Sequence, residues 1–335
     1  MTIPAGALRF NSDSGKLEVY CGGPVGFGTT TITGAWFQID SFSPTSATGG
    51  TRGVFIGGAA PGNSNTIDYI TISTTGNAID FGDCYSTGYT SNSCSSITRG
   101  VCGSGFPSNN VIQYITISST GDTQDFGDLT QSRHYVSALS NSTRGVFAGG
   151  TITSPSLTNT IDYVTISSTG DARDFGDLSQ VNARTSGCAS STRGIYSGGQ
   201  PSTNIIEYIT ISTLGNTADF GDLTQAREGA GACSNSTRGI IAGGNIPAGN
   251  TNTIDFVNIS NIGNATDFGD LTQIRNNMGA CSSPTRGVWG GGYAPGFRNE
   301  IDYVQIMSAG NAIDFGDLTL SRDALGAVSN GHGGL

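Results

Sequence analysis

The segment Thr143-Arg-Gly-Val-Phe-Ala-Gly-Gly150, followed by Thr160-Ile-Asp-Tyr-Val-Thr-Ile-Ser167 and Asp174-Phe-Gly-Asp177, decides the fold because its pattern occurs six times. Thr-Arg-Gly begins at Thr51, Thr98, Thr143, Thr192, Thr237 and Thr285. Asp-Phe-Gly-Asp begins at Asp80, Asp125, Asp174, Asp219, Asp267 and Asp314. Successive copies lie 45 to 49 residues apart, which is the period at which one four-stranded blade of a β-propeller repeats.

Each copy contains four predicted strands. In the third copy, Arg144–Gly150 is a short apolar run that ends in a glycine pair, and Thr160–Ser167 alternates and is rich in β-branched residues. A turn leads to a third strand over 172–178, and a fourth around 187–190 precedes the next Thr-Arg-Gly. These four strands are predicted to form the meander of one blade, and no helical period of useful length interrupts them. The expected fold class is all-β.

The spacing within the repeat locates its variable part. The interval from Asp-Phe-Gly-Asp to the next Thr-Arg-Gly is constant, and so is the interval from the acidic or amide residue of the second strand to Asp-Phe-Gly-Asp. All length variation falls after the glycine pair, in loops near 59–65, 106–110, 151–159, 200–204, 245–252 and 293–299. Loops tolerate variation and carry binding residues, so these loops are predicted to form one functional face with the connections that hold Arg133, Arg227, Arg275 and Arg322. The candidate binding residues on it are Phe106, Tyr293, Phe297 and Arg298.

The C-terminal segment indicates how the ring closes. Arg322–Asn330 repeats the fourth-strand pattern of Arg133–Asn141, but no further blade follows it. We therefore expect it to pair with the first blade near Thr51, which removes the exposed edges of an open sheet. This arrangement gives six blades, with seven as the alternative if residues before 45 build one more.

Composition excludes several classes of partner. Charged residues make up 12% of the chain, the formal net charge is -10, and Lys16 is the only lysine. Phosphate-backbone binding needs clustered cations, so nucleic acid and anionic membrane surfaces are not expected partners. No apolar run approaches the ~20 residues that span a bilayer, and the first residues lack the pattern of a secretory signal. Synthesis in a host cytoplasm without a signal peptide is the expectation.

The cysteines and histidines do not predict a metal or redox site. Cys94, Cys188, Cys233 and Cys281 share a repeat position that Ala47, Leu139 and Val328 fill elsewhere, and Cys84 and Cys102 also stand at apolar positions. They are predicted to be small buried hydrophobic residues, with a Cys84–Cys94 bridge as the open alternative. His134 and His332 are expected at the surface rather than as ligands. No metal and no cofactor are expected.

The repeated charged residues are predicted to be structural. Asp-Phe-Gly occurs in protein kinases, but this chain has neither their strand lysine nor their catalytic loop. The arginines of Thr-Arg-Gly are expected to pair with aspartates of Asp-Phe-Gly-Asp; the residues concerned are Arg52, Arg99, Arg144, Arg193, Arg238, Arg286, Asp80, Asp125, Asp174, Asp219, Asp267 and Asp314. The acidic residues of the second strand are expected to be solvated or to cap turns; they are Asp68, Asp162, Glu207, Asp255 and Asp302. No catalytic residue is predicted.

Two resemblances indicate a biological context. The order of a glycine pair, a Tyr-bearing strand and an aromatic third strand resembles kelch-type propellers, although Phe replaces Trp. Asn159–Asp171 followed by Asp-Phe-Gly-Asp-Leu is similar to the kelch-like repeats of structural proteins from marine tailed phages. Gly6–Tyr20, two strands around an Asn-Ser-Asp-Ser-Gly turn, and the Trp-bearing Gly34–Ile39 resemble a short β-module of phage tail fibres. The insertion Pro24–Thr33 departs from the compact form of that module.

The resemblances imply a non-enzymatic structural protein of a virion: a tail fibre, spike or capsid decoration. Residues 1–41 would be a β-hairpin module that attaches to other virion proteins, and residues 42–335 a propeller that acts as an adhesin towards a host-surface glycan or protein, or binds a neighbouring subunit. A homo-oligomer, trimeric by analogy with fibres, is the expected assembly. The alternative function is a carbohydrate-binding or glycan-degrading propeller.

Overall fold

The computed structural model describes residues 7–11, 16–21, 35–38, 51–85, 93–153 and 155–335. These residues form strands, turns and loops, and none of them belongs to a helix that could cross a membrane. The chain divides into two units, Met1–Gly49 and Gly50–Leu335. The boundary predicted at residues 41 and 42 lies outside the described residues.

The first unit contains a three-stranded antiparallel sheet, in the order β1 (Leu8–Asn11), β2 (Lys16–Cys21) and β3 (Ala35–Gln38). The predicted hairpin and Trp-bearing strand are confirmed, because Leu8 is in register with Val19 and Tyr20 with Trp36. The predicted turn between β1 and β2 and the insertion Pro24–Thr33 lie outside the described residues.

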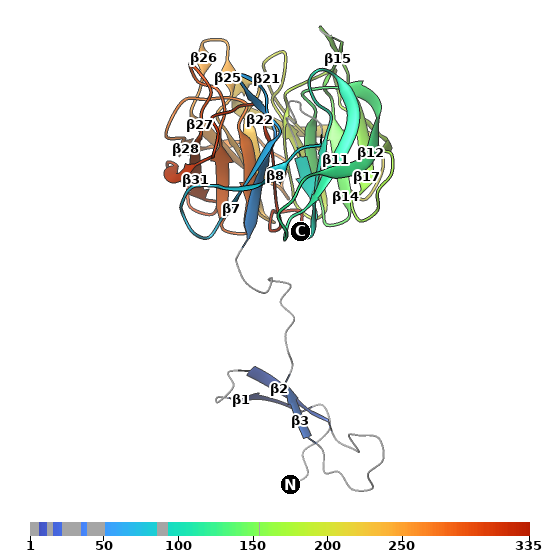
Figure 1. The fold of residues 1–335 in the computed structure, drawn as a ribbon, viewed down its shortest axis with the longest axis vertical. Coiled ribbons are helices and arrows are strands. Elements are labelled where there is room, and N and C mark those ends of the chain that lie inside the picture. Colours follow the sequence, from blue (N-terminus) through green and yellow to red (C-terminus); the bar gives the residue numbers. More distant parts are fainter. Residues whose placement is uncertain (1–6, 12–15, 22–34, 39–50, 86–92, 154) are drawn as a thin grey trace. The chain divides into compact units, whose positions relative to one another are not determined.

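The second unit is a six-bladed β-propeller, as predicted (Figure 1). From the centre outwards the blades are β33 (Gly326–Ser329), β4 (Arg52–Ile56), β7 (Thr66–Thr71) and β8 (Ile79–Asp83) in blade 1; β9 (Ser93–Ser95), β10 (Arg99–Gly103), β11 (Asn109–Thr116) and β12 (Gln124–Arg133) in blade 2; β13 (Ser137–Ser140), β14 (Arg144–Ala148), β17 (Thr160–Thr165) and β18 (Arg173–Asp177) in blade 3; β19 (Ser186–Ala189), β20 (Arg193–Ser197), β21 (Thr203–Thr210) and β22 (Ala218–Arg227) in blade 4; β23 (Gly231–Ser234), β24 (Arg238–Ala242), β27 (Thr253–Asn258) and β28 (Thr266–Asp270) in blade 5; and β29 (Gly279–Ser282), β30 (Arg286–Gly290), β31 (Glu300–Gln305) and β32 (Ile313–Asp317) in blade 6.

Three of the variable loops form small hairpins of their own. These are β5 (Ala59–Ala60) with β6 (Gly62–Asn63), β15 (Thr151–Thr153) with β16 (Ser156–Leu157), and β25 (Asn245–Ile246) with β26 (Gly249–Asn250). In Figure 1, β15, β25 and β26 lie at the end of the propeller opposite the C-terminus. We call this end the loop face and the opposite end the turn face.

The grouping of strands into blades differs from the prediction. The strand before each Thr-Arg-Gly is not the last strand of its own copy but the innermost strand of the next blade, as in β19, which pairs with β20. The reason is that the chain returns from the rim to the centre after each Asp-Phe-Gly-Asp strand. The same offset explains closure: β33 pairs with β4, with Val328 opposite Val54. The predicted closure by the C-terminal strand is confirmed.

The Asp-Phe-Gly-Asp segment joins neighbouring blades. Phe268 packs edge-on against Phe256 with 6.0 Å between ring centroids, and its carbonyl accepts a hydrogen bond of 2.7 Å from the amide of Gly310 in the next blade. Gly269, at a φ of +147°, follows a register shift between β27 and β28. A Cβ there would lie 2.5 Å from the Gly310 carbonyl oxygen. Glycine therefore permits both the bulge and the close approach of two blades.

We expect Gly269→Ala to destabilise the propeller more than Gly310→Ala does. Gly310 has a similar φ of +153°, but a Cβ there meets nothing within 4 Å. Both variants incur backbone strain of about 1–3 kcal/mol, whereas Gly269→Ala must also push the blades apart, which adds about 1–3 kcal/mol. Equal unfolding free energies for the two variants in a denaturant titration would contradict the role assigned to the close approach.

The cysteines of the propeller are buried and free, as predicted. Cys188, for example, lies close to Gly239 of the next blade, and burial raises the pKa of Cys94, Cys188 and Cys281 to about 12. Such thiols are poor nucleophiles and poor ligands at neutral pH. The bridge considered between Cys84 and Cys94 is not formed.

The innermost strands surround a central channel with a cavity of about 60 Å³. At its turn-face end, serine hydroxyls donate to the carbonyl of the preceding blade, as Ser329 Oγ does to Ser282 O at 2.6 Å. The C-terminal segment crosses this end: His332 Nε2 lies 2.9 Å from Ser95 O, and the amide of Gly333 donates to Ser234 O. The prediction of a surface histidine at His332 is therefore wrong, and the channel is covered at the turn face.

Candidate binding site at the mouth of the channel

The variable loops and the connections between blades meet at the loop face, as predicted. Single β-bridges join each pair: His134 with Thr151, Ala183 with Gln200, Glu228 with Asn245, Asn276 with Tyr293, and Ala59 with Asp323. Because one partner in each bridge belongs to a connection that runs from the rim to the centre, the loops are held close to the opening of the channel.

The connection arginines lie inside this face rather than on it. Arg133, Arg227, Arg275 and Arg322 form ion pairs of 2.8 to 3.1 Å with Asp162, Asp255, Asp302 and Asp68, and all eight side chains are at most 1% exposed. The prediction that these second-strand aspartates are solvated or cap turns is wrong. Each is buried because the connection from the preceding blade passes over it and supplies the arginine.

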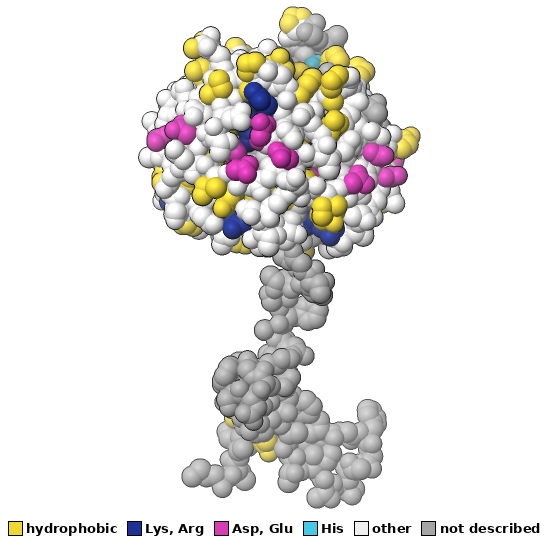
Figure 2. All heavy atoms as spheres, turned by 60° about the vertical axis from the view of Figure 1, so that its left-hand side comes forward, with side chains coloured by type: hydrophobic (Ala, Val, Ile, Leu, Met, Phe, Trp, Pro, Cys, Tyr) yellow, Lys and Arg dark blue, Asp and Glu magenta, His cyan; other side chains and the backbone are white. Residues whose placement is uncertain are grey.

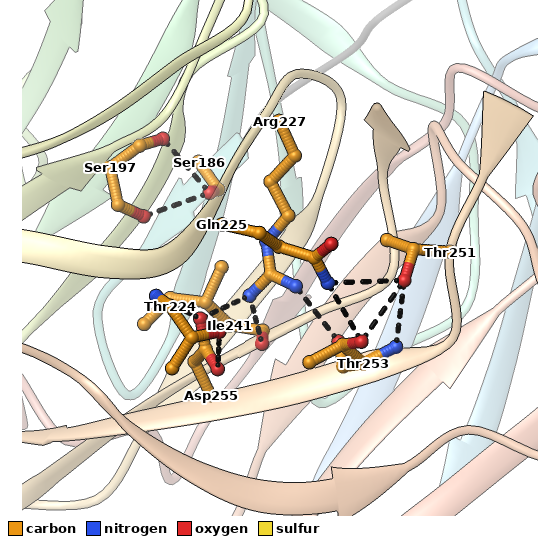
Figure 3. Close-up of polar contacts among 9 residues, drawn as sticks. All are labelled: Ser186, Ser197, Thr224, Gln225, Arg227, Ile241, Thr251, Thr253 and Asp255. Atoms are coloured by element: carbon orange, nitrogen blue, oxygen red, sulfur yellow. Dashed lines mark hydrogen bonds and ion pairs between the residues drawn. The ribbon is translucent and has the colours of Figure 1, made fainter. Parts of the chain in front are cut away.

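Figure 3 shows one of these pairs with its hydrogen bonds. Arg227 Nη2 lies 2.9 Å from Asp255 Oδ2 and donates to Ile241 O, while Nη1 donates to Thr253 O at 3.0 Å. Thr224 Oγ1 donates to Asp255 Oδ1 at 2.7 Å. Burial lowers the pKa of Arg227, and the charge of Asp255 opposes that shift. Since the charges are buried and paired, this cluster supports the framework and is closed to a ligand.

The Thr-Arg-Gly arginines also serve the framework, but not with the predicted partner. The Arg144 guanidinium carbon lies 4.5 Å from the centroid of the Tyr163 ring, and Nη1 donates to Ile211 O in the next blade at 2.6 Å. All six copies stack on the ring of the second strand and donate to a next-blade carbonyl. The predicted ion pairs with Asp-Phe-Gly-Asp are therefore wrong. The first aspartate of each motif is exposed on an outer strand, and Figure 2 shows groups of acidic side chains around the side of the propeller.

A ring of backbone hydrogen bonds surrounds the mouth of the channel. Its members follow each buried arginine position by two residues: Tyr135, Arg184, Gly229, Asn277 and Ala324, with φ between 49° and 62°. Each later member donates its amide to the carbonyl of the one before, over 2.7 to 3.0 Å. Positive φ is strained for the four members that are not glycine. The ring fixes the backbone uniformly, so that each blade places a different side chain at the mouth. The equivalent residue of the remaining copy, Thr90, lies outside the described residues.

The side chains at the mouth are chemically mixed. They line a pocket of about 30 Å³ formed by Tyr135, Arg184, Thr185, Gly229, Ala230, Asn277, Met278 and Ala324. The Arg184 guanidinium carbon lies 4.1 Å from the centroid of the Tyr135 ring, and Nη1 is 3.7 Å from Glu228 Oε1. Burial raises the pKa of the neighbouring Asp323, and both a hydrogen bond with Asn277 and the charge of Arg184 oppose that shift. A cation, an aromatic face, an amide and a carboxyl group are therefore offered around one opening.

The four residues predicted for binding do not form one cluster. Phe106 and Tyr293 are each 42% exposed on the loop face, but they belong to loops of blades 2 and 6, with blade 1 between them. Phe106 packs against His134, Tyr293 packs against Phe297, and Arg298 Nη1 is 3.7 Å from Glu300. His134 is buried, and its Nδ1 lies 2.7 Å from Ser108 Oγ, so its predicted surface position is also wrong.

Sequence reasoning missed the mouth because its residues lie in connections of constant length. The available signal was the position two residues after the connection arginine, which holds Tyr, Arg, Gly, Asn and Ala in the described copies. No protein-family model matches the chain, and a search of curated proteins found no match. Within the described part of the chain, no group of three or more His, Cys, Asp or Glu residues is placed to hold a metal ion.

Asp323 is predicted to make the stability of the propeller depend on pH. Because burial raises its pKa above the ordinary 3.8, the folded state binds this proton more tightly than the unfolded state. Its contribution to stability therefore falls as pH rises from the ordinary value through the raised one. Asp323→Asn should be more stable than the native chain at neutral pH, with the difference vanishing in acid. Unfolding curves between pH 3 and 7 test this, and a constant difference would contradict it.

Proposed function

We propose that this chain is a non-enzymatic binding protein of a virus particle, a fibre, spike or decoration subunit, whose loop face binds a host surface or a neighbouring subunit. The observation that carries the binding role is the division of labour among its polar groups. The repeated arginines bind carbonyls, rings and aspartates inside the framework, as Arg144 and Arg227 do. Only the mouth and its loops offer a different set of side chains in each blade.

The particle context rests on the resemblance of the repeats and of the first forty residues to phage structural proteins. In this proposal residues 1–41 attach the chain to other virion proteins, and the propeller is displayed outward. A propeller suits this role because its blades form a closed ring without free sheet edges, while its loops can vary without changing the framework.

The attachment role is tested by deleting residues 1–41. The truncated chain should still bind host cells through its loop face but should no longer be incorporated into particles, as measured by immunoblotting of purified virions. A matched full-length chain carrying Leu214→Gln, a change at an exposed turn-face residue, should be incorporated normally. Unchanged incorporation of the truncated chain would rule out attachment through this segment.

A second candidate is a carbohydrate-binding or glycan-degrading propeller, and the mouth supplies the observation that favours it. Polar groups converge on a small pocket beside a carboxyl group whose pKa burial raises, and a carboxyl held protonated can act as a general acid. Glycan arrays combined with hydrolysis assays separate the outcomes. Turnover abolished by Asp323→Asn indicates an enzyme, whereas binding without turnover indicates a lectin-like adhesin.

A further inference from the structure

Blade 4 departs from the pattern of the arginine-containing blades at three linked positions. In blades 1, 3, 5 and 6 the second strand carries Asp, the residue ten positions later is Ala, and the preceding connection carries Arg. Blade 4 has Glu207, Thr217 and Asn182 at these positions. Blade 2 has the neutral Gln113 with Thr123, and Gly88 stands in its connection. Loss of the arginine thus accompanies a change of the acid, which indicates that the three residues form one unit.

In the arginine blades the guanidinium is enclosed by oxygen atoms. In blade 3, Arg133 Nη1 donates to Gly149 O at 2.8 Å and Thr160 O at 2.7 Å. Its Nη2 donates to Phe147 O at 3.3 Å and to Asp162 Oδ2 at 2.8 Å. Three backbone carbonyls and one carboxylate therefore hold a single positive charge away from water.

Blade 4 retains the residues of this oxygen cage but not the guanidinium. The positions equivalent to the four acceptors of Arg133 are Tyr196, Gly198, Ile205 and Glu207, and these four residues line a cavity of about 10 Å³ together with Leu178, Asn182 and Thr185. The Glu207 carboxylate accepts hydrogen bonds from Thr217 Oγ1, Ser179 Oγ and the Ser179 amide. Within the described chain, no ion pair joins it to a Lys, Arg or His side chain.

Two oxygen atoms on the lining residues have no hydrogen-bond partner. Asn182 donates through Nδ2 to Gly198 O at 3.0 Å, but its buried Oδ1 has no partner. The buried Oγ1 of Thr185 is also without one, and other described copies have Val136, Ala230, Met278 or Leu325 at this position. The two residues are 7% and 4% exposed. Leaving such groups unpaired costs about 1–3 kcal/mol each, which a ligand of positive charge would offset.

We propose that blade 4 binds one monovalent alkali cation, Na⁺ or K⁺, in this cavity. The cation takes the place of the guanidinium, with the Glu207 carboxylate, Asn182 Oδ1, Thr185 Oγ1 and backbone carbonyls as the oxygen donors. A charge of +1 balances the single buried carboxylate, as arginine does in the other blades. The volume suits one guest about the size of a water molecule, and oxygen-only donors rich in carbonyls are typical of sites for hard cations. This site is separate from the proposed binding function.

Thermal unfolding of the full chain at constant ionic strength tests the proposal. Tetramethylammonium chloride supplies a cation too large for the cavity, and KCl or NaCl supplies one that fits. The melting temperature should be about 1–3 °C higher in at least one of the alkali salts. Identical melting temperatures in all three salts would overturn the proposal.

Two variants assign the effect to this cavity. Glu207→Gln copies the neutral residue of blade 2, and the triple variant Asn182→Arg, Glu207→Asp, Thr217→Ala copies blade 3. Both should lose the difference between salts, and the triple variant remains informative if Glu207→Gln does not fold. Persistence of the difference in the triple variant would overturn the assignment.

A crystal soaked in thallium(I) provides the direct observation. An anomalous peak should appear in the cavity of blade 4 and not at the arginine sites of blades 1, 3, 5 and 6. Density for a water molecule only, with no anomalous signal in the cavity, would also overturn the proposal.

Discussion

Arg227→Met is expected to lower the free energy of unfolding by about 3–5 kcal/mol, because it leaves the Asp255 carboxylate buried without its counter-charge. The substitution preserves much of the aliphatic volume, so the loss is electrostatic. It also removes the donors to Ile241 O and Thr253 O. Denaturant titration followed by tryptophan fluorescence measures the change.

Two controls separate this effect from simple loss of a side chain. Arg173→Met removes an exposed arginine from the outer strand of blade 3 and should change stability by less than about 0.5 kcal/mol. Replacing both partners, as Arg227→Met with Asp255→Leu, should recover much of the loss because no charge is then left buried. A cost for Arg227→Met no larger than that for Arg173→Met would contradict the role of the pair.

Val328→Asp is expected to be still more damaging, at about 4 kcal/mol or more, because it buries a carboxylate without a partner at the point of ring closure. Val328 is 3% exposed in β33 and lies opposite Val54 of β4. Because β33 is the only segment that joins the end of the propeller to blade 1, we expect hydrogen exchange in β4 to accelerate together with the loss of global stability.

The matched control is Val181→Asp, at a position that is 51% exposed. It introduces the same charge without burying it and should leave both stability and the exchange of β4 amides nearly unchanged. Full protection of β4 in the Val328→Asp variant would mean that β33 does not close the ring.

The repeat predicted the framework because each blade states the same local rules. Alternating β-branched strands, glycine turns and apolar cysteine positions require only one copy of the sequence to be interpreted, and the structure confirms them. What failed were interactions between copies. Asp255 looks solvated within its own strand, and its partner Arg227 precedes it by 28 residues in the connection from another blade. The linked changes of Asp, Ala and Arg were the signal, but only the geometry shows why they change together.

The candidate site was harder to predict than the fold. Length variation and exposed aromatic residues directed attention to the loops of Phe106 and Tyr293, which lie on the predicted face but on blades that are not adjacent. The mouth residues Tyr135, Arg184 and Asn277 sit in connections of uniform length, and their positive φ values are invisible in the sequence. The predictions of virion attachment and host binding remain proposals.

The most direct test of the account is whether a ligand binds at the mouth. Binding of the labelled full chain to host cells and to a glycan array should be measured for the native chain, for Arg184→Ala at the mouth, and for Leu214→Gln at the turn face. The account predicts a loss of about tenfold or more in affinity for Arg184→Ala, equivalent to about 1.4 kcal/mol, and native affinity for Leu214→Gln. Native binding by Arg184→Ala together with loss of binding by Leu214→Gln would contradict it.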